Sequence, residues 1–289
     1  MISPWIFAIL SPFFFATYNI LDKYILAKKV KAALSYAAVA GIVTIVYALL
    51  VGAFLDWSQF KLSNLLFPFI SGLFMGLQTF MYFHILSTED VSNFVGLIYV
   101  YPVLVALLSF FFLNERLSLF GYIGGLLTIV GVLTLSLRAQ KMKWQVNWWL
   151  LIGLIVMIAI TEFIIKVQAT TLPLMQSFAW SQLFMGLTIV AILFLPKYRR
   201  GFFQELKLLP FAFLIEFITL LAMLTLFLAM AGLPAGIVAS LQTLQVLAVL
   251  FFEKLVDASW NIAKDKDMLK KLIPILCIVV GIVLLYVFG

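Results

Sequence analysis

The sequence predicts an all-α integral membrane protein with ten transmembrane helices. Of the 289 residues, 65% are hydrophobic and only 11% are charged, with a mean hydropathy of +1.18, whereas soluble domains are roughly half apolar and a quarter charged. The apolar residues form continuous runs of about 20, the length of a helix that crosses a hydrocarbon core about 30 Å thick. Strands of a membrane barrel are about 10 residues of alternating polarity, so these runs indicate helices.

Five runs lie in each half of the chain. The first follows an opening, MISPWIF, without the basic residues of a cleavable signal peptide, so it is interpreted as a permanent helix. Pro68 and Pro210 stand at matching places near the starts of the third and eighth runs. The last run contains Cys277, the single cysteine, which excludes an intrachain disulfide. Because the links are short, the function must reside in the helices. The predicted spans are 3–27, 32–55, 65–86, 90–113, 117–138, 146–169, 173–195, 207–231, 233–253 and 270–288.

The net charge of +7 is explained by membrane topology. Only Lys61 and Arg116 fall in the links of one face, and by the positive-inside rule the other face is cytoplasmic, which puts both termini outside. We therefore expect a multi-pass protein of the cell (cytoplasmic or inner) membrane that attracts anionic lipids weakly and binds no nucleic acid. The cytoplasmic links hold fifteen basic residues: Lys28, Lys29, Lys31, Arg138, Lys141, Lys143, Lys197, Arg199, Arg200, Lys207, Lys254, Lys264, Lys266, Lys270 and Lys271.

The two halves resemble each other. ATYNILDKYIL in the first span aligns with AITEFIIKVQA in the sixth, which pairs Asn19 with Glu162 and Lys23 with Lys166. The ends of the fourth and ninth spans also align, at Glu115-Arg116 and Glu253-Lys254. Since five is an odd number, a second copy enters the membrane inverted, as in many secondary transporters with a site at the midplane between repeats. We predict two inverted five-helix repeats, residues 1–143 and 144–289.

The segment YPVLVALLSFFFLNERLSLFGYIGGLLTIVGVLTL resembles the end of an EamA repeat of the drug/metabolite transporter superfamily. It has a proline in the span, an acidic turn thirteen residues later at Glu115, and glycines in the next span. Asn114 stands where the family commonly has glycine; in the second half Ser240 replaces the proline, and WNIAKDKDM intrudes before the last span. The resemblance implies two five-helix bundles and alternating-access transport of small metabolites, without indicating the substrate.

Charged and amide side chains within the spans are candidates for the transport site. A charge at the bilayer centre costs at least about 2.5–3.5 kcal/mol, so such residues usually face a cavity or form pairs. Glu216, Glu162 and Asn19 lie near the middle of their spans, while Asp22 lies nearer the cytoplasmic end. Glu162 and Lys166 are four residues apart and could instead form an ion pair within one helix, and Asn19 could simply bond to a neighbouring helix.

Glu216 has no basic residue within a helical turn. Such a carboxyl group can exchange a proton near neutral pH, as a proton-coupled carrier requires, or it can recognise a cation. A protonated Glu216 that donates one structural hydrogen bond is the alternative.

Neutral polar and aromatic residues at similar depths would suit a small amphipathic ligand, although each could equally be packing. Pro102 interrupts the fourth span and predicts a kink that acts as a gate hinge or as a static bend. The further binding candidates are Gln78, Tyr82, Tyr99, Trp180, Gln242 and Gln245.

These observations favour a secondary active transporter that exports or exchanges a small amphipathic metabolite or cation, with proton coupling and without a cofactor. One alternative is a carrier of a lipid or lipid-linked head group; another is a non-transporting scaffold or sensor. An enzyme is not expected, because His84 is the only histidine and no GxGD, HExxH or P-loop pattern occurs. The substrate, direction of transport and oligomeric state stay open.

Overall fold

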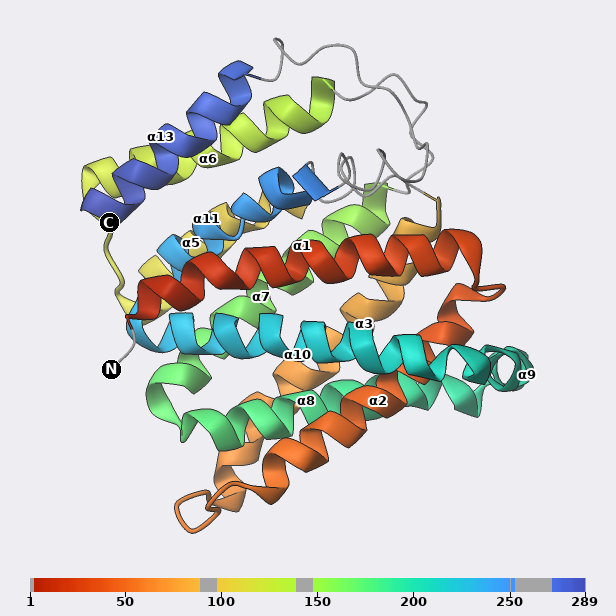
Figure 1. The fold of residues 1–289 in the computed structure, drawn as a ribbon. Helices are drawn as coiled ribbons and strands as arrows, with labels where there is room; N and C mark the ends of the chain where they lie inside the picture. Colours follow the sequence, from red (N-terminus) through yellow and green to blue (C-terminus); the bar gives the residue numbers. More distant parts are fainter. Residues whose placement is uncertain (1–2, 89–97, 139–147, 250, 253–271, 289) are drawn as a thin grey trace.

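The computed structural model describes residues 3–88, 98–138, 148–249, 251–252 and 272–288. Within these ranges the chain is helical and contains no strand, which confirms the all-α prediction. Figure 1 shows the helices packed side by side as one bundle. The α-helices are α1 (Pro4–Lys28), α2 (Ala33–Ala53), α3 (Leu66–Thr88), α5 (Tyr101–Leu113), α6 (Leu119–Arg138), α7 (Trp148–Thr171), α8 (Leu174–Val190), α9 (Pro196–Glu205), α10 (Leu209–Gly232), α11 (Ala235–Leu241) and α13 (Leu272–Phe288).

Six helical segments of the described chain are long and apolar enough to cross a membrane, and four further apolar helices are shorter. Large apolar side chains on the outer surface, such as Phe111 and Phe112, each 72% exposed, suit contact with lipid. The chain is thus a multi-pass membrane protein, while ten crossing helices stay a prediction. The additional helix α9 lies between the predicted seventh and eighth spans.

Two predicted spans are interrupted rather than continuous. In the fourth, Ile98 is helical, Tyr99 and Val100 form a turn, and α5 begins at Tyr101. In the ninth, α11 ends at Leu241, Gln242 and Thr243 form a turn, and helix resumes at Leu244.

The prediction that Pro102 kinks a continuous helix is wrong. Pro102 stands in the first turn of α5, where a proline removes no helical hydrogen bond because the N–H groups there have no partner within the helix. It therefore starts a helix rather than bending one.

Small residues let helices from the two halves approach closely. A Cβ added at Gly186 of α8 would lie 2.9 Å from the carbonyl oxygen of Gly41 in α2. Similarly, a Cβ at Gly281 of α13 would lie 2.5 Å from the carbonyl oxygen of Gly124 in α6. The α6–α13 pair forms one edge of the bundle (Figure 1), and its backbone contact depends on glycine on both sides.

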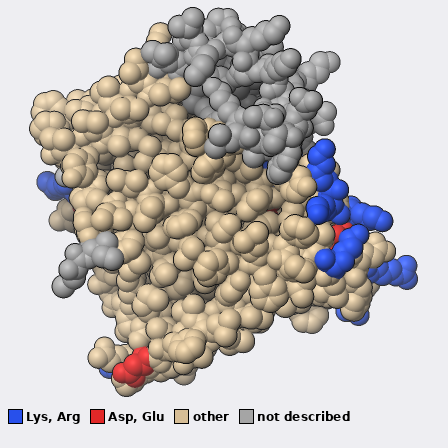
Figure 2. Space-filling view, in the orientation of Figure 1, with Lys and Arg blue, Asp and Glu red and all other residues tan. Residues whose placement is uncertain are grey.

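Most of the basic residues visible on the surface lie at one end of the bundle. Figure 2 shows lysine and arginine side chains concentrated beside α9, at the end opposite to the two chain termini marked in Figure 1. Glu205, at the end of α9, is 1% exposed and accepts hydrogen bonds at Oε1 from the backbone N–H groups of Lys31 (2.8 Å) and Ala32 (3.2 Å). This buried contact fixes α9 against the link that precedes α2.

Candidate functional site

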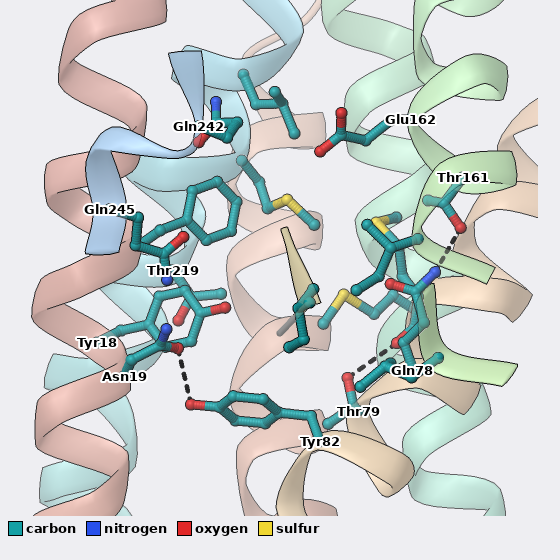
Figure 3. A pocket seen from close by; sticks show the side chains of 18 of the residues that line it. Tyr18, Asn19, Gln78, Thr79, Tyr82, Thr161, Glu162, Thr219, Gln242 and Gln245 are labelled. Carbon is teal, nitrogen blue, oxygen red and sulfur yellow. Dashed lines mark hydrogen bonds between the residues drawn. The ribbon is translucent and has the colours of Figure 1, made fainter. Parts of the chain in front are cut away.

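A cavity of about 170 Å³ lies inside the bundle, between helices of both halves of the chain. Its walls come from α1, α2 and α3 of the first half, from α7, α8 and α10 of the second, and from the two interrupted spans. Figure 3 shows polar side chains projecting into it from several helices. The polar lining residues are Tyr18, Asn19, Asp22, Gln78, Thr79, Tyr82, Tyr99, Tyr101, Thr161, Glu162, Glu216, Thr219, Gln242 and Gln245.

The cavity brings together all but one of the candidate binding residues. Those that line it are Asn19, Gln78, Tyr82, Tyr99, Glu162, Glu216, Gln242 and Gln245. Trp180 does not, because its face of α8 turns toward aromatic rings: the indole stacks on Phe184 at 5.5 Å between ring centroids and meets Trp57 edge-on at 6.0 Å. Pro102 is buried next to the cavity-lining Tyr101 but is not in the wall itself.

Three carboxyl groups from three helices face this one space: Asp22 from α1, Glu162 from α7 and Glu216 from α10. No lysine, arginine or histidine is among the described residues that line it. Charges of like sign in a low-dielectric space raise the free energy of one another's ionised forms. The cavity therefore favours occupants that bring positive charge, whether protons or a cationic molecule.

Two hydrogen-bond networks hold opposite walls of the cavity. The Tyr82 hydroxyl donates to Asn19 Oδ1 at 2.8 Å and to Asp22 Oδ2 at 3.2 Å, which links α3 to α1. On the other wall, Gln78 Nε2 donates to Thr161 Oγ1 at 2.5 Å and to the carbonyl oxygen of Met157 at 3.0 Å. Figure 3 shows the Tyr82–Asn19 and Gln78–Thr161 bonds, with Glu162 and Gln242 on opposite sides of the cavity.

The remaining polar groups are also positioned by neighbouring helices. Thr44 Oγ1 of α2 donates to Glu216 Oε2 at 3.0 Å. Gln242 Nε2 donates to Ser11 Oγ of α1 at 3.1 Å, and the Tyr99 hydroxyl donates to Gln245 Oε1. The two interrupted spans thus contact each other through their polar side chains at the cavity.

Lys166 is not paired with Glu162, so the alternative of an ion pair within one helix is wrong. Its Nζ lies 3.0 Å from Oε1 of Glu115 at the end of α5, and it also donates to the carbonyl oxygens of Met230 (3.0 Å) and Leu233 (2.7 Å). The other Glu115 oxygen, Oε2, accepts from the backbone N–H of Ala235 at 2.8 Å. Glu162 instead lines the cavity. The corresponding Glu253 and Lys254 lie outside the described residues.

Several cavity residues were not among the sequence candidates. Asp22 was expected near the cytoplasmic interface, yet it is only 4% exposed and lines the cavity with Asn19. The signal was available, because residues three apart share a helix face. The same spacing argument applies to Tyr18, four residues before Asp22. Within the described chain no three acidic, cysteine or histidine side chains are grouped as metal ligands.

Comparison with known proteins gives a family and a fold. Residues 3–137 match the EamA-like transporter family. A solved crystal structure is similar over 98% of this chain and 99% of its own chain, with a TM-score of 0.64 at 17% identity, which shows a shared fold alone. No curated protein matches the chain. Residues 3–137 of this multi-pass membrane protein, just under half of the chain, are thus similar to the EamA-like transporter family, in agreement with the resemblance seen in the sequence.

Proposed function

We propose that this protein is a secondary active transporter that carries a small amphipathic metabolite or cation by alternating access. The observation that supports this most is the cavity, whose polar lining comes from both halves of the chain. A carrier must expose one site to each side in turn, so the site belongs where two parts of the bundle can move against each other.

We propose further that the two parts are inverted repeats, residues 1–143 and 144–289. The helix contacts support this, since they occur in matching pairs: α1 packs on α10 as α7 packs on α3, and α2 packs on α10 as α8 packs on α3. The aligned lysines make matching bonds as well. Lys23 Nζ donates to the carbonyl oxygen of Leu86 at 2.9 Å, near the end of α3, and Lys166 Nζ to that of Met230 at 3.0 Å, near the end of α10.

Glu216 is the residue that we assign to proton coupling. It faces the cavity together with Asp22 and Glu162, and it accepts a hydrogen bond from the neutral Thr44 hydroxyl. A carboxyl group in such surroundings can pick up a proton on one side of the membrane and release it on the other. The membrane is the cell membrane, with the basic end of the bundle in the cytoplasm and both termini outside.

The test is transport in proteoliposomes with an imposed pH gradient, using labelled amines, amino acids, nucleosides and sugar phosphates. We expect accumulation of at least one of these, and we expect Glu216→Gln to lower gradient-driven accumulation by at least about tenfold, equivalent to about 1.4 kcal/mol. The control is Asp56→Asn, which changes a carboxylate on the exposed link before α3. Unchanged accumulation with Glu216→Gln would remove this residue from the coupling mechanism, and no accumulation of any compound would argue against a carrier.

A further inference from the structure

Three buried oxygen atoms in the cavity wall have no hydrogen-bond partner within the protein. They are Asp22 Oδ1, Glu162 Oε2 and Gln242 Oε1, on side chains that are 4%, 6% and 2% exposed. Among the described residues that line the cavity, no buried nitrogen donor is left without a partner in the same way. Buried acceptors without partners cost free energy, so an occupant that donates hydrogen bonds here is favoured.

The positions of these oxygens suggest how an occupant is held. The three acceptors come from α1, from α7 and from the turn that interrupts the ninth span. Two of the side chains are fixed through their other polar atom, since Tyr82 donates to Asp22 Oδ2 and Gln242 Nε2 donates to Ser11 Oγ. Figure 3 shows Glu162 and Gln242 on opposite sides of the space. The three acceptors therefore belong to side chains that line one cavity, and hydrogen bonds to neighbouring helices hold two of these side chains in place.

Charge restricts the occupant further. A phosphate or carboxylate would meet three carboxyl groups and no basic side chain in the described lining. A zwitterionic amino acid would satisfy the acceptors with its ammonium group but would leave its own carboxylate without a cationic partner. A cation without an acidic group of its own avoids both problems.

The rest of the lining suits an apolar body. Tyr18 and Tyr82 meet edge-on at 6.1 Å between centroids, and Tyr99 and Tyr101 lie 5.6 Å apart, with Phe15 also in the wall. Aromatic faces attract cations and pack against apolar groups. An engineered protein cavity of about 150 Å³ holds benzene, so a space of about 170 Å³ suits roughly one ring with a short side chain.

From these observations we propose that the cavity binds a small organic cation that carries N–H donors, a primary amine or guanidinium compound with an apolar body, rather than a quaternary ammonium, an anion or a zwitterion. The inference rests on the proposed function only in taking the cavity as the substrate site. The ammonium N–H groups donate to Asp22 Oδ1, Glu162 Oε2 and Gln242 Oε1, and the apolar body packs among the tyrosine and phenylalanine rings.

Binding to the purified protein in detergent tests this without any transport step. Calorimetry would compare phenethylamine with three relatives of similar shape: N,N,N-trimethylphenethylammonium, which keeps the charge but lacks N–H groups, 2-phenylethanol, which lacks the charge, and phenylalanine, which adds a carboxylate. We expect phenethylamine to bind, and each relative to bind at least about tenfold more weakly, because a hydrogen bond to a charged group contributes about 1.5–3 kcal/mol.

Variants locate the bound amine. Asp22→Asn and Glu162→Gln should each weaken phenethylamine binding by about tenfold or more, while Asp56→Asn, on the exposed link, leaves it unchanged. Thermal unfolding of each variant without ligand separates loss of binding from loss of fold. If one variant does not fold, Gln242→Leu removes the third acceptor and serves in its place.

The outcomes distinguish this inference from the proposed function. Equal affinity for the trimethyl compound, or no binding of phenethylamine at millimolar concentration, would overturn the proposed substrate class. If another class of compound is transported while amines do not bind, the carrier function stands and this inference is wrong. If phenethylamine binds through Asp22 and Glu162 but nothing is transported, this inference stands and the carrier function fails.

Discussion

Asn114 shows how one residue places a functional side chain. It ends α5 in the left-handed conformation, with φ 54° and ψ 28°, and the next residue, Glu115, donates its backbone N–H to the carbonyl oxygen of Ser109 at 3.2 Å. This helix ending normally uses glycine, and asparagine is the next most tolerant residue. The departure from the family's glycine therefore keeps the backbone geometry, which turns Glu115 toward Lys166.

Substitutions at Asn114 should separate backbone tolerance from side-chain chemistry. Asn114→Gly should leave thermal stability in detergent nearly unchanged, whereas Asn114→Val should lower the free energy of unfolding by about 1–2 kcal/mol, because a β-branched residue is strained in the left-handed region. Thermal unfolding of the two variants measures the difference. An equal loss of stability in both would mean that the asparagine side chain, rather than the backbone conformation, matters.

The sequence predicted which way some of the buried polar side chains face and missed others. Depth within a span was enough to select Glu162 and Glu216, because a carboxyl group so deep must avoid lipid. The same criterion missed Asp22, because the distance of a residue from the membrane centre does not show how far a cavity extends along the helix. Spacing within α7 allowed a Glu162–Lys166 pair, but it could not reveal Glu115, a competing partner on another helix.

Among the elements, the ends of α5, α7, α10 and α11 meet at one ion pair, in which Lys166 is buried and Glu115 is partly buried. Lys166 lies 3.0 Å from Glu115 and also donates to carbonyl oxygens at the end of α10, while Glu115 accepts from the first residue of α11. Removing one partner of a buried pair leaves an uncompensated charge and typically costs about 3–5 kcal/mol. This contact therefore joins the two halves at the end of the bundle opposite to the basic surface.

A double-mutant cycle measures this contact. Lys166→Met and Glu115→Gln should each lower the free energy of unfolding by roughly 3 kcal/mol. The double variant should be less destabilised than the sum of the two by at least about 1 kcal/mol, since neither charge is then left alone. Unfolding in a detergent titration gives the four free energies. Strictly additive losses would show that the two side chains do not interact.

The elements themselves were largely predictable, and their interruptions were not. Hydrophobic length placed most helices within a few residues, because lipid forces every backbone group into helical hydrogen bonds. The turns at Tyr99–Val100 and Gln242–Thr243 were missed, because backbone may leave the helix where it lines a cavity, and nothing local marks Gln242-Thr243 as a break. Pro102 indicated the first interruption but suggested a kink instead of a helix start.

For the whole molecule, the distribution of charge predicts the orientation in the membrane. Lys61 lies on the exposed link before α3, and Arg200 lies on the exposed side of α9. If the basic end is cytoplasmic, a membrane-impermeant maleimide should label Lys61→Cys in intact cells and Arg200→Cys only after permeabilisation, both in a Cys277→Ser background. The opposite labelling pattern would invert the topology.

The placement of the two interruptions has a consequence for kinetics. Each lies in the wall of the cavity, at Tyr99 and Gln242, so a bound molecule touches the points where the backbone leaves the helix. If the protein is the carrier proposed above, substrate binding and reorientation of the helices involve the same residues, and no chain of intervening residues is needed to connect the two. In the proposed carrier, changes at Tyr99 or Gln242 should alter the Michaelis constant and the turnover number together, whereas changes at Lys166, which is not in the wall, should affect the turnover number alone.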